Sequence, residues 1–142
     1  MIVYLDSSAL LRYLLKTPGA YADFGTWDKA VSSELLTLEC RRTLHRLRLI
    51  GELGDEDMAY FSALVSEFMD TIDIIRVTSS LMDQAGMAFP TVIGSLDAIH
   101  LVSLLAYQGD IKRPVALLSH GRQLVLAARS LGVQSITLQS RD

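Results

Sequence analysis

The amino-acid sequence predicts an α/β fold, a three-layer α/β/α sandwich around a central, mostly parallel sheet. Short apolar runs typical of buried strands alternate with longer segments of helical periodicity along the chain. Of the 142 residues, 50% are hydrophobic and 20% are charged, a composition typical of a globular protein. The length suits a single domain, which we expect to span residues 1–142.

A strand opens the chain. Ile2 to Leu5 is a short apolar run with β-branched residues, and Asp6-Ser7-Ser8 then supplies residues that favour helix N-termini. The helix that begins there should end before Pro18-Gly19, because both residues break helices. Apolar spacing and the positions of glycine and proline predict the remaining elements. In order, these are a short helix over 20–29, a strand over 31–33, helices over 34–50 and 56–69, a strand over 72–77, helices over 79–88 and 96–107, a strand over 115–118, a helix over 122–131 and a strand over 133–138.

Three acidic residues stand out because apolar sequence flanks each of them. Asp6 directly follows a strand, and Glu39 lies in the second turn of a predicted helix. Asp97 lies in the first turn of the long helix that Ser95 should cap. Ligands of parallel sheets bind outside the carboxyl ends of the strands. Carboxylates that converge there repel one another, and a divalent cation with oxygen ligands relieves that repulsion.

Each acid also has a purely structural explanation. Asp6 alone could be a helix N-cap, and Asp97 could stand near a helix start because negative charge is favourable there. Glu39 could pair with Thr43 or Arg42 on its own helix. The spacing leaves both explanations open. The case for a site is that the three acids belong to separate elements that could meet at one sheet edge.

Charge and composition restrict the remaining functions. The net charge of −3 argues against a basic, nonspecific nucleic-acid coat, but not against an enzyme that holds RNA through metal ions and a local basic patch. Arg42 and Arg46 could form such a patch or only a solvated helix face, and His120 could contact phosphate or fill an ordinary surface role. Neither a signal-peptide start nor a membrane-spanning apolar stretch is present in the sequence, so we expect a cytoplasmic protein without a membrane partner. Cys40, the single cysteine, should be a buried apolar residue.

Four motifs resemble those of the PIN-domain family. Residues 3–10, VYLDSSAL, resemble its opening strand motif, and residues 32–44, SSELLTLECRRTL, resemble its second motif with Glu39 at the acidic position. Residues 95–101, SLDAIHL, are similar to the third, and the fourth runs from Leu117 to Val133. The resemblance covers about residues 2 to 136, and the small size is similar to that of VapC-type toxins.

The resemblance implies a metal-dependent endoribonuclease, the toxin of a type II toxin–antitoxin pair, that hydrolyses RNA phosphodiester bonds with Mg²⁺ or Mn²⁺. It implies that Asp6, Glu39 and Asp97 are catalytic. Asp6 and Asp97 would bind the metal directly, whereas Glu39 would act through water. Ser7 and Ser119 would support them.

The resemblance also implies partners. A VapC-like toxin would form a homodimer and would be held in check by a cognate VapB-like antitoxin. The apolar stripe around Met58 and Phe61 predicts core packing, and its resemblance to VapC-like proteins suggests an antitoxin groove as the alternative.

One position departs from the family pattern. The fourth motif usually has an aspartate two residues after its Ser or Thr, and this chain has Gly121 there. The missing carboxylate favours an alternative, a catalytically impaired domain that binds RNA or its antitoxin without cutting, and it puts a second metal ion in question. A third hypothesis is a phosphoryl-accepting switch with Asp6 as the acceptor. Such a site would want a second acid where Ser8 stands.

Overall fold

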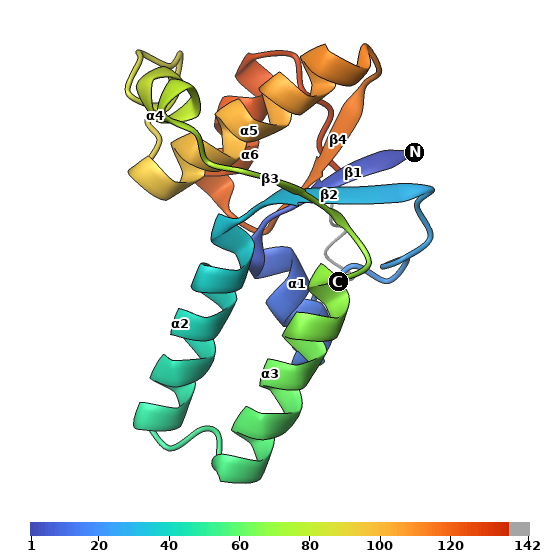
Figure 1. The fold of residues 1–142 in the computed structure, drawn as a ribbon, viewed down its shortest axis with the longest axis vertical. Helices are drawn as coiled ribbons and strands as arrows, with labels where there is room; N and C mark the ends of the chain where they lie inside the picture. The colour runs from blue at the N-terminus through green and yellow to red at the C-terminus, as the bar shows by residue number, and fades with distance from the viewer. Residues whose placement is uncertain (137–142) are drawn as a thin grey trace.

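The computed structural model describes residues 1–136 of the chain (Figure 1). Strands and helices alternate in most of it, as the sequence predicts. The elements are β1 (Ile2–Leu5), α1 (Ser7–Leu14), β2 (Lys29–Ser33), α2 (Leu35–Leu49), α3 (Asp55–Met69), β3 (Asp73–Ile75), α4 (Ser79–Ala85), α5 (Ser95–Ile111), β4 (Val115–Leu118) and α6 (Arg122–Ser130).

The four strands form one parallel sheet in the order β3-β2-β1-β4. In this register Ile2 of β1 lies opposite Lys29 of β2 on one side and Val115 of β4 on the other. The chain leaves β1 towards β2 and returns with β4 on the other side of β1, so the winding direction reverses between β1 and β4. A parallel sheet opens a crevice at the carboxyl ends of the strands where this reversal occurs. Asp6 follows β1 and Ser119 follows β4 at that place.

Helices cover both faces of the sheet, because successive residues of a buried strand point to opposite layers. Ile2 and Tyr4 belong to the core on the α5 and α6 side, whereas Val3 and Leu5 belong to the core on the α1 side. The helices α4, α5 and α6 lie on one side of the sheet in Figure 1, and α1, α2 and α3 lie on the other. The predicted three-layer α/β/α arrangement is therefore confirmed.

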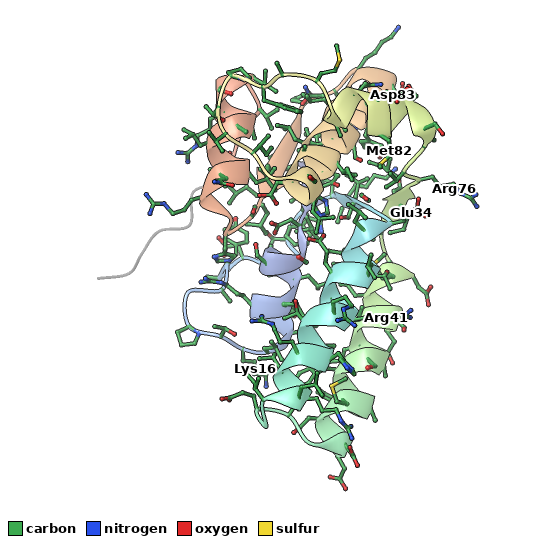
Figure 2. The ribbon with its side chains drawn as sticks, turned by 90° about the vertical axis from the view of Figure 1, so that its left-hand side faces the viewer. Lys16, Glu34, Arg41, Arg76, Met82 and Asp83 are labelled. Atoms are coloured by element: carbon green, nitrogen blue, oxygen red, sulfur yellow. The ribbon has the colours of Figure 1, made fainter. Side chains whose placement is uncertain are left out.

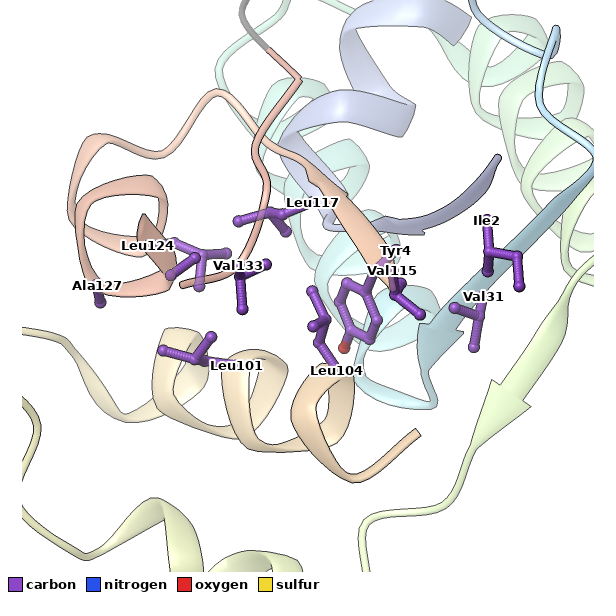
Figure 3. Close-up of a cluster of buried hydrophobic side chains, with 11 residues drawn as sticks. Ile2, Tyr4, Val31, Leu101, Leu104, Val115, Leu117, Leu124, Ala127 and Val133 are labelled. Atoms are coloured by element: carbon purple, nitrogen blue, oxygen red, sulfur yellow. The ribbon is translucent and has the colours of Figure 1, made fainter. Parts of the chain in front are cut away.

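The core between the sheet and α5 is mostly apolar. Figure 3 shows Leu104 of α5 beside Tyr4 of β1, and Leu101 of the same helix on the side of Leu124; both α5 leucines are almost fully buried. Leu117 of β4 and Leu124 of α6 close the same cluster. Burying a large apolar side chain contributes about 1.5–3 kcal/mol. This core fixes α5 against the sheet and so positions the acidic residue in its first turn.

The helices α2 and α3 extend from the sheet as a pair (Figure 1). Their contact includes the fully buried Cys40, whose thiol pKa burial raises to about 12, with the charges of Glu39 and Asp6 acting in the same direction. Cys40 is therefore a protonated core residue, as expected. Met58 and Phe61 pack against the same cluster, which confirms their predicted core role.

No helix within residues 1–136 is long and apolar enough to cross a membrane.

The short helix predicted over residues 20–29 is wrong. This segment forms turns instead, and Gly25 has a φ of +91°, which L residues with side chains rarely adopt. The segment folds around Phe24, whose ring stacks on Tyr13 at 3.9 Å and meets Trp27 edge-on at 4.8 Å. Tertiary contacts of the aromatic rings therefore override local helix propensity.

The start and end of α5 also differ from the prediction. Gly94 occupies the N-cap position and Ser95 is the first helical residue, so Ser95 is not the cap. The helix runs to Ile111 rather than to Tyr107. It ends at Lys112, which adopts a left-handed conformation with φ of 53°.

Two predicted strands are shorter than expected. The strand over 72–77 is reduced to β3, because the Val77 N–H donates to Glu34 Oε1 at 2.6 Å, in place of a strand partner. Glu34 stands at the N-terminal end of α2 (Figure 2). Of the strand predicted over 133–138, the described part holds one bridge, between Ser135 and Leu117. Residues 137 and 138 lie outside the described residues.

Candidate active site

Asp6 is the buried centre of the carboxyl edge, with 6% of its surface exposed. It is the N-cap of α1 and accepts a hydrogen bond from the Ala9 N–H at 3.1 Å. The Ser8 hydroxyl donates to Oδ1 at 2.6 Å, and the Ser119 hydroxyl donates to Oδ2 at 2.6 Å. The structural explanation of Asp6 as a cap is correct, but it does not account for the two serine donors.

Both serine hydroxyls also accept hydrogen bonds from the turn between β4 and α6. The His120 N–H donates to Ser8 Oγ at 2.9 Å, and the Gly121 N–H donates to Ser119 Oγ at 2.9 Å. Each hydroxyl thus accepts a hydrogen bond from one backbone N–H and donates one to an oxygen of Asp6. Hydrogen bonds to an ionised acceptor are short and strong, so this arrangement holds the turn and the carboxylate together.

Asp97 lies in the first turn of α5 and is half-buried. Burial raises its pKa above the ordinary value of an aspartate, and the negative charges of Asp6 and Glu39 raise it further, whereas His100 lowers it. The three carboxylates predicted from the sequence are therefore within electrostatic range of one another. Asp6 lies between β1 and α1, whereas Glu39 belongs to α2 and Asp97 to α5, so the three are far apart in the chain.

Glu39 pairs with a residue of another helix, not with Thr43 or Arg42 of its own. Its Oε1 contacts Nε2 of His100, and the opposite ring nitrogen, Nδ1, lies 2.7 Å from the Tyr4 hydroxyl. His100 is 1% exposed. His100 is therefore a packed and hydrogen-bonded residue of α5.

The donor chemistry of the acids suits a hard divalent cation. Within residues 1–136 neither Asp6 nor Asp97 forms a salt bridge with a lysine or arginine, and carboxylate oxygens are the ligands that Mg²⁺ and Mn²⁺ prefer. In the same part of the chain, no three His, Cys, Asp or Glu side chains approach closely enough to form a preassembled metal cluster. Two carboxylates with water would thus make up a binding site, which Mg²⁺ tolerates because it keeps several waters.

The other predicted residues lie at different places around the acids. Arg42 and Arg46 are exposed on α2, and they share the side of the helix that carries Glu39 because they follow it by three and seven residues. His120 is half-buried, and burial lowers its pKa, as does the nearby Arg12, whereas Asp6 opposes the shift. Its buried Nε2 has no hydrogen-bond partner among the described residues.

Position 121 borders Asp6. Gly121 has a φ of −78°, so this turn does not require glycine for a left-handed conformation. A Cβ placed on it would lie 3.9 Å from Asp6 Oδ2 and 3.3 Å from Ser119 Oγ. The carboxylate that the family pattern would place at this position would therefore point to the site, and its absence in this chain removes one acidic group beside Asp6.

Sequence reasoning missed three residues of this site. Ser8, rather than Ser7, donates to Asp6, and a hydroxyl two residues after an aspartate N-cap is the signal that could have found it. His100 follows Asp97 by three residues, which places both on one side of α5. Tyr4 gives no signal in the sequence, because a tyrosine within an apolar strand looks like an ordinary core residue.

The raised pKa of Asp97 makes its ionised form unfavourable in the folded state. The penalty is present when the pH lies above the folded-state pKa, and it disappears as the pH falls through that value. Asp97→Asn removes the penalty, so without divalent cations it should melt at a higher temperature than wild type at pH 7. The difference should shrink as the pH falls through this raised pKa, because the folded-state carboxyl then becomes protonated. Thermal denaturation followed by circular dichroism measures both quantities.

The control for this measurement is Asp23→Asn in an exposed loop, which should show no such pH-dependent difference. A lower melting temperature of Asp97→Asn at every pH would contradict the assigned repulsion.

Comparison with known proteins agrees with the motif resemblance. No family model matches the chain. The chain is 28% identical to Ribonuclease VapC47 of Mycobacterium tuberculosis (strain CDC 1551 / Oshkosh), over 92% of this chain and 93% of the relative. It is also 28% identical to Ribonuclease VapC46 of Mycobacterium tuberculosis (strain ATCC 25618 / H37Rv), over 94% and 95% of the two chains.

Solved structures share the fold at low sequence identity. VapBC-1 from nontypeable Haemophilus influenzae superposes with a TM-score of 0.58 at 13% identity, over 97% of this chain and 98% of that one. FitAB bound to an IR36 DNA fragment superposes with a TM-score of 0.66 at 11% identity, over 100% of both chains. PAE2754 from Pyrobaculum aerophilum has a TM-score of 0.58 at 18% identity, over 94% and 89%. The chain is thus similar in sequence to two VapC ribonucleases, and it shares the fold of these solved structures.

Proposed function

We propose that the chain is a metal-dependent endoribonuclease, the toxin of a type II toxin–antitoxin pair, that hydrolyses RNA phosphodiester bonds. The observation that carries the proposal is the gathering of three acids at the carboxyl edge of the sheet, where burial and then the charges of Asp6 and Glu39 raise the pKa of Asp97. Two relatives that align along nearly their whole length are named ribonucleases, which supports the same activity.

Asp6 and Asp97 would hold Mg²⁺ or Mn²⁺ at this edge. When bound, such an ion neutralises charge on the phosphate and lowers the pKa of water. The protein residues have separate tasks. Ser8 and Ser119 keep Asp6 in place, as supporting groups, and Glu39 orients the attacking water.

Positive side chains outside the acidic centre would bind the substrate. Arg42 and Arg46 lie on the Glu39 side of α2, where they can contact RNA phosphates without reading the bases. His120, on the turn beside Asp6, would contact a phosphate through its imidazole. Ser7 is also a proposed supporting residue because it adjoins Asp6 in the sequence, although Ser8 is the residue that donates a hydrogen bond to Asp6.

We further propose a homodimer and a VapB-like antitoxin partner. VapBC-1 and FitAB, whose names denote two-component assemblies, share this fold. Clustered carboxylates bind arginine through paired, charge-assisted hydrogen bonds, so an antitoxin side chain could compete with the cation near Asp6 and Asp97. A toxin of this kind would act in the cytoplasm, on cellular RNA.

The alternative is an impaired domain that binds RNA or an antitoxin without cutting, and Gly121 is the observation that favours it. The phosphoryl-acceptor hypothesis has less support. Both carboxylate oxygens of Asp6 already accept hydrogen bonds from serines, and the residue is buried, so a phosphodonor has poor access to it.

Asp6→Asn should reduce Mg²⁺-dependent RNA cleavage by about 100-fold or more, because one charge of the cation site is lost. Asn is close to Asp in shape, so the α1 cap should persist. The measurement is cleavage of total RNA and of a structured transcript at saturating Mg²⁺. Asp83→Asn on α4, labelled in Figure 2, is the matched control and should cut at the wild-type rate. Wild-type rates for folded Asp6→Asn would contradict the site assignment.

Gly121→Asp should restore a carboxylate beside Asp6. A third oxygen ligand supplies both charge and a fixed donor, so Mn²⁺ binding should tighten by roughly 10-fold, equivalent to about 1.4 kcal/mol. Cleavage should rise as well, since a second ion could then stabilise the leaving oxygen. Calorimetric titration with Mn²⁺, paired with the cleavage assay, measures the two effects. Circular dichroism checks the fold, because the new Cβ lies close to Ser119 Oγ.

Gly109→Asp, on the exposed surface of α5, adds the same charge away from the site and should change neither value. The impaired-domain alternative gains support if wild type does not cut and Gly121→Asp does. Equal affinity and rate in Gly121→Asp and wild type would show that position 121 does not limit metal binding.

A further inference from the structure

We propose that His100 is a positioning residue for Glu39, and that a buried chain from Tyr4 through His100 fixes the direction of the Glu39 carboxylate. The inference rests on the proposed function, in which Glu39 orients the attacking water. Holding Glu39 for that task would be the purpose of the hydrogen bonds from Tyr4 through His100. His100 itself touches neither substrate nor cation in this account. It acts through Glu39.

The imidazole of His100 has a partner on each nitrogen. The Tyr4 hydroxyl lies 2.7 Å from Nδ1, and Glu39 Oε1 contacts Nε2. The Tyr4 ring meets the imidazole edge-on, with centroids 5.7 Å apart and planes inclined by 80°. The ring of His100 is thus held at both ends and along one edge, which leaves it one orientation.

The hydrogen positions follow from the partners of the ring. A carboxylate accepts hydrogen bonds and does not donate them, so Nε2 of His100 carries a hydrogen and donates it to Glu39 Oε1. In this arrangement Nδ1 accepts the hydrogen of the Tyr4 hydroxyl. This tautomer directs one carboxylate oxygen of Glu39 inward and leaves the other for water.

The location of the chain argues against a purely packing role. Leu101 and Leu104, buried neighbours of His100 in α5, are apolar and fill the core, and the one buried hydroxyl nearby, Ser103, donates to Ile99 O of its own helix. A buried imidazole costs free energy unless its nitrogens are paired, so an apolar side chain would be the simpler core residue. The Glu39 side chain keeps 19% of its surface exposed, whereas that of His100 keeps 1%. His100, which is buried, therefore holds the Glu39 side chain, which still reaches solvent at the edge of the site.

Steady-state cleavage by the full chain, with Mg²⁺, tests the role through a double-mutant cycle. His100→Leu should lower kcat by about 10- to 100-fold with little change in KM, as loss of a supporting residue commonly does. His100→Gln should recover most of the rate, because its amide N–H can reach Glu39 from the position of Nε2. In a Glu39→Gln background, His100→Leu should cost less than about 2-fold further, since coupled residues are non-additive.

Tyr4→Phe removes only one oxygen from the chain and keeps the core filled. It should lower kcat less than His100→Leu does, whereas Tyr107→Phe should have no effect. Tyr107 is the matched control, because its hydroxyl donates to Asp73 at 3.0 Å, outside the acidic site. Tyr4→Phe also keeps the test decisive if His100→Leu fails to fold.

Nitrogen-15 spectra of histidine-labelled protein test the contact without activity. Wild type should show Nε2 of His100 protonated and Nδ1 as an acceptor, and Glu39→Gln should shift the Nε2 signal. Spectra with Nδ1 protonated and no response to Glu39→Gln would overturn the inference. Equal losses from His100→Leu with and without Glu39 would overturn it too. If the wild-type protein cleaves no RNA, the proposed function is overturned, and with it the catalytic purpose of the hydrogen bonds from Tyr4 to Glu39. The spectra would still decide whether His100 contacts Glu39.

Discussion

Repulsion among three carboxylates at the carboxyl edge of the sheet is the constraint on which the surrounding structure depends. Removing an ionised carboxylate from water is costly unless hydrogen bonds and counter-charges compensate. Asp6 meets this requirement with two serine hydroxyls and one backbone N–H, and hydrogen bonds to a charged group contribute about 1.5–3 kcal/mol each. Glu39 meets it with a buried histidine. Asp97 has the least compensation of the three, and its raised pKa is the consequence.

The topology of the sheet explains why these groups meet. A parallel sheet directs all carboxyl ends to one edge, and the winding reverses between β1 and β4, the place where such sheets bind ligands. The helix α1 follows β1 directly, so Asp6 both begins that helix and lies at this edge. The turn after β4 returns to the same place, and its backbone N–H groups reach Asp6 through Ser8 and Ser119. Fold and site are thus stabilised by the same hydrogen bonds.

The positions of the acids in the fold were predictable from the sequence because each stands in a local context that has a known structural meaning. Asp6 follows an apolar strand, and Asp97 falls in the first turn of a helix, so both could be assigned to one sheet edge. The partners of the acids were not predictable in this way. Glu39 has suitable partners on its own helix, and only the packing of α2 near α5 selects His100 instead.

The errors in secondary structure have the same origin. Residues 20–29 contain helix-forming residues, yet the stacking of Phe24 on Tyr13 and a left-handed Gly25 fold them into turns. The strand over 72–77 is shortened because Glu34, distant in sequence, takes the N–H of Val77. Contacts between segments that are far apart in the chain decided each of these cases, and periodicity does not report such contacts.

The central claim is that Asp6 and Asp97 bind one divalent cation at the carboxyl edge of the sheet. A crystal of the full chain soaked in Mn²⁺, with data collected at a wavelength where manganese scatters anomalously, tests this directly. The account predicts an anomalous peak between these two carboxylates, with Glu39 directed towards a water of the ion. A peak at another acidic cluster, or no peak beside Asp6 at saturating Mn²⁺, would contradict it.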